Sequence, residues 1–411
     1  MKTLLIIGAG VDQLPAYELA RDMGLRTIAF DYNPDAPAFN ISDFSYCVST
    51  KDVTKAVTTA LKINEQIHID GVITLGAEVS PTVSGVAVAL NLPGVPPKVA
   101  LYTTNKCHRA EIFSEAGIRF PKYSVLEDTN TVKDLHYPLV IKPSDNSASR
   151  GVRIVENLEQ LKSAFPNAKK LSSDDKVIVE EFIPGDQISI EGIVVDGKLY
   201  VTAIADRNYS RNSYFYPLMV EDGGEMPSRH CEKTIAAMCL EFSRAVDCLD
   251  IKTGPTKGDL IISKDGDIYV IEVTSRLSGG GFCSRVVPRV NGINIVKTTI
   301  ELALGSEVDT TDLNPKFSKG MCHRYYFHKP GTITSIDGLE KAKSMPGVME
   351  LVINQPFSVG TTLEEVNYAN RLFYIITIAE TRKLAIELAE LAMDSVTIET
   401  QDKLPTVKAE N

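Results

Sequence analysis

The sequence predicts an α/β domain with a parallel sheet at the N-terminus, followed by two α+β regions. Residues 1–100 alternate apolar strand segments with helical segments, which is typical of parallel strands joined by helical crossovers. Residues 101–315 carry Asp-Gly pairs at 196–197 and 265–266 between alternating apolar runs, and such pairs indicate antiparallel hairpins. Residues 316–402 combine strand segments with one amphipathic helix. The predicted fold class is therefore α/β plus α+β.

Apolar periodicity and glycine turns set the individual elements. In the N-terminal region the predicted strands and helices are residues 4–10, 14–24, 26–31, 70–76 and 80–92. In the middle region they are residues 105–117, 137–145, 151–155, 176–185, 188–207, 234–246, 258–276 and 294–305. In the last region, helix 381–396 is expected to bury Leu384, Ile386, Leu388, Leu391 and Ala392.

Bulk composition narrows the function classes. With 411 residues, 44% hydrophobic and 23% charged, the chain is long enough for several globular domains. A net charge of −10 disfavours a sequence-independent nucleic-acid binder. The opening apolar run at residues 4–7 is too short for a signal peptide or a membrane helix, so a cytoplasmic protein without a membrane partner is expected. The seven cysteines lack metal-site spacing and are interpreted as reduced thiols.

The first strand ends in a glycine turn that partly matches a dinucleotide-binding fingerprint. Gly8 and Gly10 follow the strand, and Asp31 ends the next one. Gln13 stands where the third glycine of that fingerprint would be, so the match is incomplete. An NAD-dependent oxidoreductase is the alternative that rests on these residues, and a plain strand-to-helix turn is the simpler interpretation.

A lysine and a loop of small polar residues follow one another in the middle region. Lys142 ends a strand at Lys-Pro, and the loop at 145–151 can bring backbone amides close to phosphate oxygens. Lys106 begins an earlier helix. The loop residues predicted to contact a nucleotide are Ser147, Ser149, Arg150 and Gly151.

A second strand runs into two acids and a Pro-Gly pair. Glu180 and Glu181 are adjacent on this strand, so their side chains point to opposite faces and one of them at most faces a nucleotide. The backbone of Phe182 or Ile183 is placed to meet adenine nitrogens, and Gln187 to meet ribose hydroxyls. The segment therefore predicts a hinge for a nucleotide base.

Two further acids lie on either side of the Asp-Gly turn at 265–266. Asp259 and Glu272 are expected on neighbouring antiparallel strands, where they can meet on one face. Paired carboxylates with oxygen-only ligation indicate magnesium rather than zinc. Arg276 follows four residues after Glu272 and offers a bidentate guanidinium to a carboxylate or a phosphoryl group.

This order of motifs resembles the ATP-grasp superfamily, over nearly the whole chain. The resemblance implies that Lys106 and Lys142 bind nucleotide, that Lys142 and Arg276 are catalytic, and that Asp259 and Glu272 hold Mg²⁺, with Mn²⁺ as an alternative ion. It implies a Rossmann-like domain over 1–100, an ATP-grasp domain of two subdomains over 101–315 with a lid at about 122–185, and a closing domain over 316–402 of the biotin carboxylase-like and L-amino-acid ligase branch.

The sequence departs from the pattern of that superfamily at two positions. Thr274 stands where the superfamily usually has a third metal ligand, Asn, so the second magnesium is expected to be weaker or bridged by water. Gln187 stands where an acid commonly meets the ribose.

By resemblance, the expected reaction is ADP-forming ligation of a small carboxylate, such as an amino acid, to an amine through an acyl phosphate. Ser278, Gly279 and Gly280 are expected to cradle the acceptor or an oxyanion, and Glu78, at the carboxyl end of a strand, is expected to contact a substrate amine. The alternatives are a ligase that activates bicarbonate or formate, the oxidoreductase, and a catalytically silent nucleotide-binding scaffold. A homodimer is the default expectation for the assembly.

Overall fold

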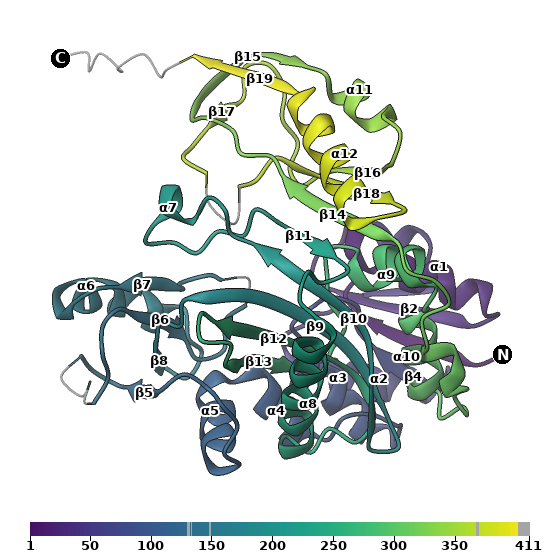
Figure 1. Ribbon diagram of the computed structural model, residues 1–411. Helices are drawn as coiled ribbons and strands as arrows, with labels where there is room; N and C mark the ends of the chain where they lie inside the picture. Colours follow the sequence, from purple (N-terminus) through teal and green to yellow (C-terminus); the bar gives the residue numbers. More distant parts are fainter. Residues whose placement is uncertain (130–131, 133, 148, 367–369, 402–411) are drawn as a thin grey trace, which may run out of the picture.

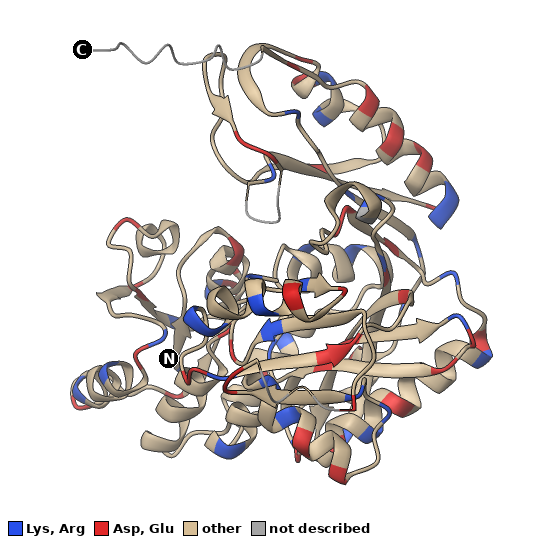
Figure 2. Ribbon diagram, turned by 90° about the vertical axis from the view of Figure 1, so that its left-hand side faces the viewer, with Lys and Arg blue, Asp and Glu red and all other residues tan. Residues whose placement is uncertain are grey.

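The computed structural model describes residues 1–129, 132, 134–147, 149–366 and 370–401. The predicted end of the C-terminal domain, residue 402, lies outside the described residues. No helix in these ranges is both long and apolar enough to span a membrane. Lys and Arg residues are interleaved with Asp and Glu residues over the central body of the molecule (Figure 2).

The N-terminal region forms the predicted parallel sheet, with strand order β3-β2-β1-β4. Every residue of β1 is buried, as expected for a strand covered by helices on both faces. The strands are β1 (Thr3–Ile7), β2 (Arg26–Asp31), β3 (Phe44–Cys47) and β4 (Gly71–Ile73). The helical segments are η1 (Val11–Gln13), α1 (Leu14–Asp22), η2 (Pro37–Asn40), α2 (Val53–Asn64) and α3 (Ser80–Ala89).

A small antiparallel sheet with one covering helix forms a separate layer at the left of Figure 1, and we call this layer the lid. Its strand order is β5-β8-β6-β7, and α6 packs its apolar face against β6 and β7. The lid elements are β5 (Tyr123–Leu126), β6 (Leu139–Pro143), β7 (Arg153–Val155), α6 (Leu158–Lys170) and β8 (Val177–Glu181). Helices α4 (Pro97–Thr104) and α5 (Lys106–Glu115) connect the N-terminal domain to the lid.

A large sheet of order β13-β12-β9-β10-β11-β14-β18-β16 forms the body of the molecule (Figure 1). The β9–β10 turn has Asp196 and Gly197 at positive φ, the geometry of the hairpin that an Asp-Gly pair predicts. The central strands are β9 (Gly185–Val195), β10 (Lys198–Asn208), β11 (Gly223–Met226), β12 (Gly254–Ser263) and β13 (Ile268–Thr274). The helical segments of this region are α7 (Asn212–Phe215), α8 (Glu232–Cys248), η3 (Phe282–Val286), α9 (Val287–Asn291), α10 (Ile295–Ala303) and η4 (Thr310–Leu313).

The C-terminal region extends the large sheet rather than standing apart from it. The predicted boundary at 315/316 falls just before β14, but β14 pairs with β11 of the central region, so the sheet crosses this boundary. A three-stranded sheet of order β17-β15-β19 lies beyond it. The elements are β14 (Gly320–Tyr325), β15 (Gly331–Asp337), α11 (Leu339–Ser344), β16 (Val348–Ile353), β17 (Thr362–Leu363), β18 (Phe373–Ala379), α12 (Arg382–Asp394) and β19 (Thr397–Gln401).

Helix α12 buries a different face from the one that the sequence predicts. Its buried residues are Ala385, Ala389 and Ala392, whereas Leu384 and Leu391 are exposed. Thr377 on β18 donates its hydroxyl to the Ala385 carbonyl at 2.6 Å, so the helix backbone lies close to the sheet. Small side chains allow this close approach. The expected face was therefore right for Ala392 and wrong for Leu384 and Leu391, while Ile386 and Leu388 are half-buried.

An ion-pair network fastens α12 to the central strands. Arg382 Nη1 lies 2.6 Å from Asp206 Oδ2 on β10, and Nη2 contacts Glu225 on β11. Arg324 on β14 contacts the same Glu225. Because both carboxylates are buried, they depend on Arg382 and Arg324 for compensation.

We expect Arg382→Met to lower the free energy of unfolding by about 3–5 kcal/mol, because it leaves two buried carboxylates with less compensating charge. Urea unfolding followed by circular dichroism measures this loss. The neighbouring side chain of Lys383 is 88% exposed, so Lys383→Met should stay within about 0.5 kcal/mol of the wild type. Equal effects of the two substitutions would contradict a structural role for the network.

Candidate active site

A cleft of about 1050 Å³ lies between the lid, the large sheet and the N-terminal domain. Most of the residues that the sequence singles out line it. They are Glu78, Lys106, Lys142, Ser147, Ser149, Arg150, Glu180, Glu181, Phe182, Ile183, Gln187, Asp259, Glu272, Arg276, Ser278, Gly279 and Gly280. Segments that are far apart in sequence therefore meet around one space.

Two of the predicted site residues do not line the cleft. Gly151 has a φ of +77°, and a Cβ there would lie 2.8 Å from both Leu171 and Pro143, so this glycine serves the turn of its loop. Thr274 is 2% exposed, and its hydroxyl has no hydrogen-bond partner within the described part of the chain.

The two lysines enter the cleft from different elements. Lys142, on β6, forms an ion pair with Glu180 on β8. Lys106, at the first turn of α5, donates from Nζ to the Asn146 carbonyl at 2.6 Å. Burial lowers the pKa of the Lys106 ammonium, and Glu272 opposes that effect. The Lys106 ammonium therefore contacts the loop that was predicted to cover phosphates, and the Lys142 ammonium lines the same cleft.

An apolar slot lies between the lid and the large sheet. Val140 and Val152 line it from the lid, and Leu260 and Ile271 line it from the large sheet. The amide of Phe182 donates to the Pro138 carbonyl at 3.0 Å, so this hinge amide is engaged within the lid. Apolar side chains on two sides of a cleft suit a purine ring.

Asp259 and Glu272 are directly opposite each other on β12 and β13. Opposite residues of an antiparallel pair share one face, and both carboxylates line the cleft. Asp259 accepts from Ser189 Oγ at 3.2 Å, and its Oδ2 lies 2.7 Å from Lys257 Nζ and 3.4 Å from Arg207 Nη1. Burial alone would raise the pKa of Asp259, but Lys257 and Arg207 lower it, which keeps the carboxylate ionised.

Arg109 holds the second carboxylate, and the sequence analysis did not identify it. This arginine is 2% exposed, and its Nη1 donates to the Thr103 carbonyl at 3.2 Å. Its Nη2 lies 3.3 Å from Glu272 Oε1. Burial alone would raise the pKa of Glu272, but Arg109, Lys106 and Lys257 hold it well below its usual range. The three-residue spacing from Lys106 on α5 was the available signal, because such residues share a helix face.

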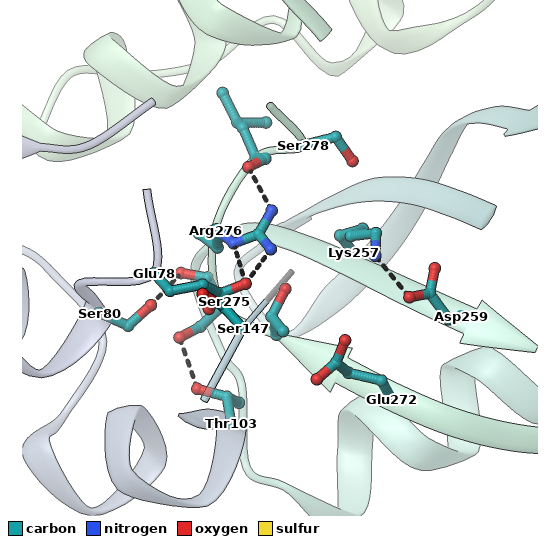
Figure 3. Close-up of polar contacts among 12 residues, drawn as sticks. Glu78, Ser80, Thr103, Ser147, Lys257, Asp259, Glu272, Ser275, Arg276 and Ser278 are labelled. Carbon is teal, nitrogen blue, oxygen red and sulfur yellow. Dashed lines mark hydrogen bonds and ion pairs between the residues drawn. The ribbon is translucent and has the colours of Figure 1, made fainter. Parts of the chain in front are cut away.

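Arg276 and Glu78, which the sequence assigns to separate contacts, are paired with each other (Figure 3). Arg276 Nε lies 2.7 Å from Glu78 Oε1, and Nη1 donates to the Leu277 carbonyl at 3.0 Å. Burial alone would lower the pKa of Arg276, but Glu78 raises it. One partner comes from the N-terminal domain, and the other comes from the segment that follows β13.

The glycine-rich loop after Arg276 is held by carboxylates. The Ser278 amide donates to Glu191 Oε1 at 3.1 Å, and the Gly280 amide donates to Asp12 Oδ2 at 3.1 Å. A Cβ on Gly76 would lie 2.7 Å from Gly279 Cα, so the loop packs directly on the N-terminal domain. Neither carboxylate was singled out from the sequence: Asp12 occupies a variable position of the glycine turn, and Glu191 lies within a predicted strand. Two of the amides expected to cradle an oxyanion are thus already engaged.

The N-terminal glycine turn is also closed on itself. The Ala9 amide donates to Asp31 Oδ2 at 2.8 Å, and the Gly10 amide donates to Gln13 Oε1 at 3.0 Å. The Gly10 amide, a donor that a dinucleotide pyrophosphate would need, is therefore already bonded to the Gln13 side chain. This arrangement favours a structural turn over the NAD alternative.

Glu191 gives the loop a pH dependence that can be measured. Burial raises its pKa from 4.5 to about 7, against the opposing effects of Ser278, Arg276 and Lys257. The folded state then holds a proton that the unfolded chain releases, so the stability from this proton is present below pH 4.5 and is lost as the pH rises through about 7.

We expect the free energy of unfolding of the wild type to fall, relative to Glu191→Gln, by up to about 3 kcal/mol between pH 4.5 and 8. The glutamine has no proton to lose, so the difference between the two proteins isolates this carboxyl group. Urea unfolding at each pH provides the measurement. A difference that is independent of pH would contradict the buried carboxyl assignment.

Comparison with known proteins identifies two domains in the chain. Residues 103–280 match the model of the ATP-grasp domain, and residues 324–401 match that of the L-amino acid ligase C-terminal domain 2. The first region contains the lid and most of the cleft residues. The second region contains the C-terminal strands.

Solved structures and sequence relatives agree with these models. The crystal structure of an L-amino acid ligase from Bacillus licheniformis is similar with a TM-score of 0.83 and 26% identity, over 98% of this chain and 99% of that chain. A biotin carboxylase from Campylobacter jejuni, in complex with β-γ-ATP, has a TM-score of 0.71 and 19% identity, over 97% of this chain and 92% of that chain.

In sequence, the alanine–anticapsin ligase of Bacillus subtilis is 22% identical over 358 residues, which is 76% of this chain and 73% of that protein. The resemblance inferred from the order of the motifs is thereby confirmed. The chain is therefore a ligase that contains an ATP-grasp domain and a C-terminal domain of the L-amino acid ligase type.

Proposed function

We propose that this ligase joins an amino acid or a similar small carboxylate to an amine, converting ATP to ADP and phosphate through an acyl phosphate. One observation carries the proposal: Lys106 and Lys142, the facing carboxylates and Arg276 all line the same cleft. These are the groups that phosphoryl transfer to a carboxylate requires, since it depends on positioning and charge stabilisation. The protein needs no covalent nucleophile for this chemistry.

The nucleotide is assigned to the space between the lid and the large sheet. Lys106 and Lys142 are proposed to contact its phosphates, and Lys142 exchanges Glu180 for phosphate when ATP binds. Ser147, Ser149 and Arg150 cover the phosphates from the loop. The apolar slot takes adenine, and Gln187 lies near the ribose.

The carboxylate pair supports a magnesium site. Asp259 and Glu272 are opposite each other and ionised, and oxygen ligands of this kind suit Mg²⁺ and also Mn²⁺. When bound, the ion supplies charge neutralisation at the phosphates. The surrounding residues keep both carboxylates ionised and oriented toward the cleft.

The Arg276–Glu78 pair supports an amino acid as a substrate. An amino acid carries a carboxylate and an ammonium on one carbon, and this pair presents the two complementary charges at one place. Arg276 then stabilises the carboxylate as it attacks the γ-phosphoryl group of ATP, and ADP leaves. The amine attacks the activated carbonyl, phosphate leaves, and the amine nitrogen loses a proton.

An aromatic wall on the C-terminal strands supports an organic side chain near this position. The His323 ring lies 4.4 Å from that of Tyr325 and 4.6 Å from that of Tyr374, centroid to centroid, and all three residues line the cleft. Burial lowers the pKa of His323 to about 4, so its ring is neutral at pH 7. Such a wall suits substrates larger than bicarbonate. The homodimer and the cytoplasmic location remain predictions.

Incubation with ATP, Mg²⁺ and mixed L-amino acids should release ADP and phosphate in equal amounts, together with a condensed product detected by mass spectrometry. Phosphate release that requires bicarbonate or formate, with no amino acid present, would favour the alternative ligase. Release from none of the acid and amine pools would contradict carboxylate–amine ligation and favour a silent scaffold.

Glu272→Gln should lower the rate of ADP formation by at least about 100-fold, because the amide removes one of two facing anions at the metal site. A coupled assay for ADP at saturating amino acid measures the rate. Glu380 is 80% exposed, and Glu380→Gln serves as the control with unchanged activity. Turnover within a few-fold of the wild type would remove Glu272 from the metal site.

A further inference from the structure

A lysine ammonium lies directly beside the carboxylate pair formed by Asp259 and Glu272. Lys257 lies two residues before Asp259 on β12, so the two side chains share the face that lines the cleft. Its Nζ is 2.7 Å from Asp259 Oδ2, and its side chain is only 13% exposed (Figure 3). This ammonium is therefore a fixed part of the site rather than a solvated surface charge.

The register of the hairpin explains this position. Lys257 is opposite Thr274, and Asp259 is opposite Glu272, so the four residues form a two-by-two set on neighbouring strands. The register between β12 and β13 shifts only between Asp259 and Leu260, so these four residues remain in regular register. Lys257 thus occupies the position across from the residue that would have to supply a third oxygen ligand.

The donors present do not fit two divalent cations. Thr274 is buried and does not line the cleft that Asp259, Glu272 and Lys257 share. Across the described ranges of the chain, no group of three or more His, Cys, Asp or Glu side chains is placed to hold a metal ion. Two carboxylates are sufficient for one ion that also binds nucleotide phosphates, whereas a second ion would have too few protein ligands.

Charge leads to the same conclusion. Asp259 contacts Lys257 and Arg207, and Glu272 contacts Arg109, so two anions already have three cationic partners. A second divalent ion would stand beside the Lys257 ammonium, where like charges repel and the surroundings are buried. One divalent ion and one ammonium place less positive charge in the site than two divalent ions do.

We propose that this site takes a single divalent cation and that the Lys257 ammonium occupies the place of a second one. The proposal rests on the proposed function, because it assigns how the charge of a bound nucleotide is neutralised. Asp259 and Glu272 hold the ion, and Lys257 supplies a positive charge that does not depend on the concentration of free metal. The facing residues Lys257 and Thr274 together, rather than Thr274 alone, distinguish this site from a two-metal site.

Equilibrium dialysis of the full chain with Mn²⁺ and a saturating non-hydrolysable ATP analogue tests the proposal by counting manganese per bound nucleotide. We expect one Mn²⁺ for the wild type and two for Lys257→Met/Thr274→Asn, which removes the ammonium and adds an amide oxygen. Lys252 is 61% exposed and pairs only with the exposed Asp250 among the described residues, so Lys252→Met is the charge-matched control with one Mn²⁺.

Two Mn²⁺ per nucleotide on the wild type would overturn the proposal. So would a single Mn²⁺ on the double variant while it binds the analogue as tightly as the wild type. If the double variant does not fold, the wild-type count alone decides. A wild type that binds no analogue would instead contradict the proposed function, so the two failures are distinguishable.

Discussion

The pairing of β12 with β13 is the constraint on which the site depends. It fixes Asp259 opposite Glu272, and it orients both carboxylates into the cleft. Two like charges that face each other in a half-buried position repel each other, so they require nearby cations. The structure supplies these from three elements: Lys257 on β12 itself, Arg207 on β10 and Arg109 on α5. Much of the surrounding architecture can be understood as the support of this one pair.

The N-terminal domain contributes polar side chains to the same cleft. Glu78 pairs with Arg276, and Asp12 accepts a hydrogen bond from the amide of Gly280, so two carboxylates of this domain reach the Arg276 end of the cleft. Glu78 and Asp12 thus bind the Arg276 guanidinium and the Gly280 amide, which are donors that can also bind anions. In the proposed function, a substrate at this end of the cleft therefore meets groups from both the N-terminal domain and the segment that follows β13.

Sequence patterns predicted the local features and missed those that depend on tertiary packing. The Asp-Gly turn at 265–266 was sufficient to predict that Asp259 and Glu272 are neighbours, because a hairpin fixes register locally. Arg109 and Glu191 belong to no motif, and only the assembled fold places them against the site. The leucine face expected for α12 was wrong, because alanine permits closer packing on the sheet than apolar periodicity alone can indicate.

The central claim is that the substrate carboxylate itself attacks the γ-phosphoryl group. Turnover of an amino acid with ¹⁸O in its carboxylate, followed by mass spectrometry of the released phosphate, tests that claim most directly. The account predicts one labelled oxygen in each phosphate, because the bridging oxygen of the acyl phosphate leaves with phosphorus. Unlabelled phosphate, or release of AMP and pyrophosphate, would contradict it.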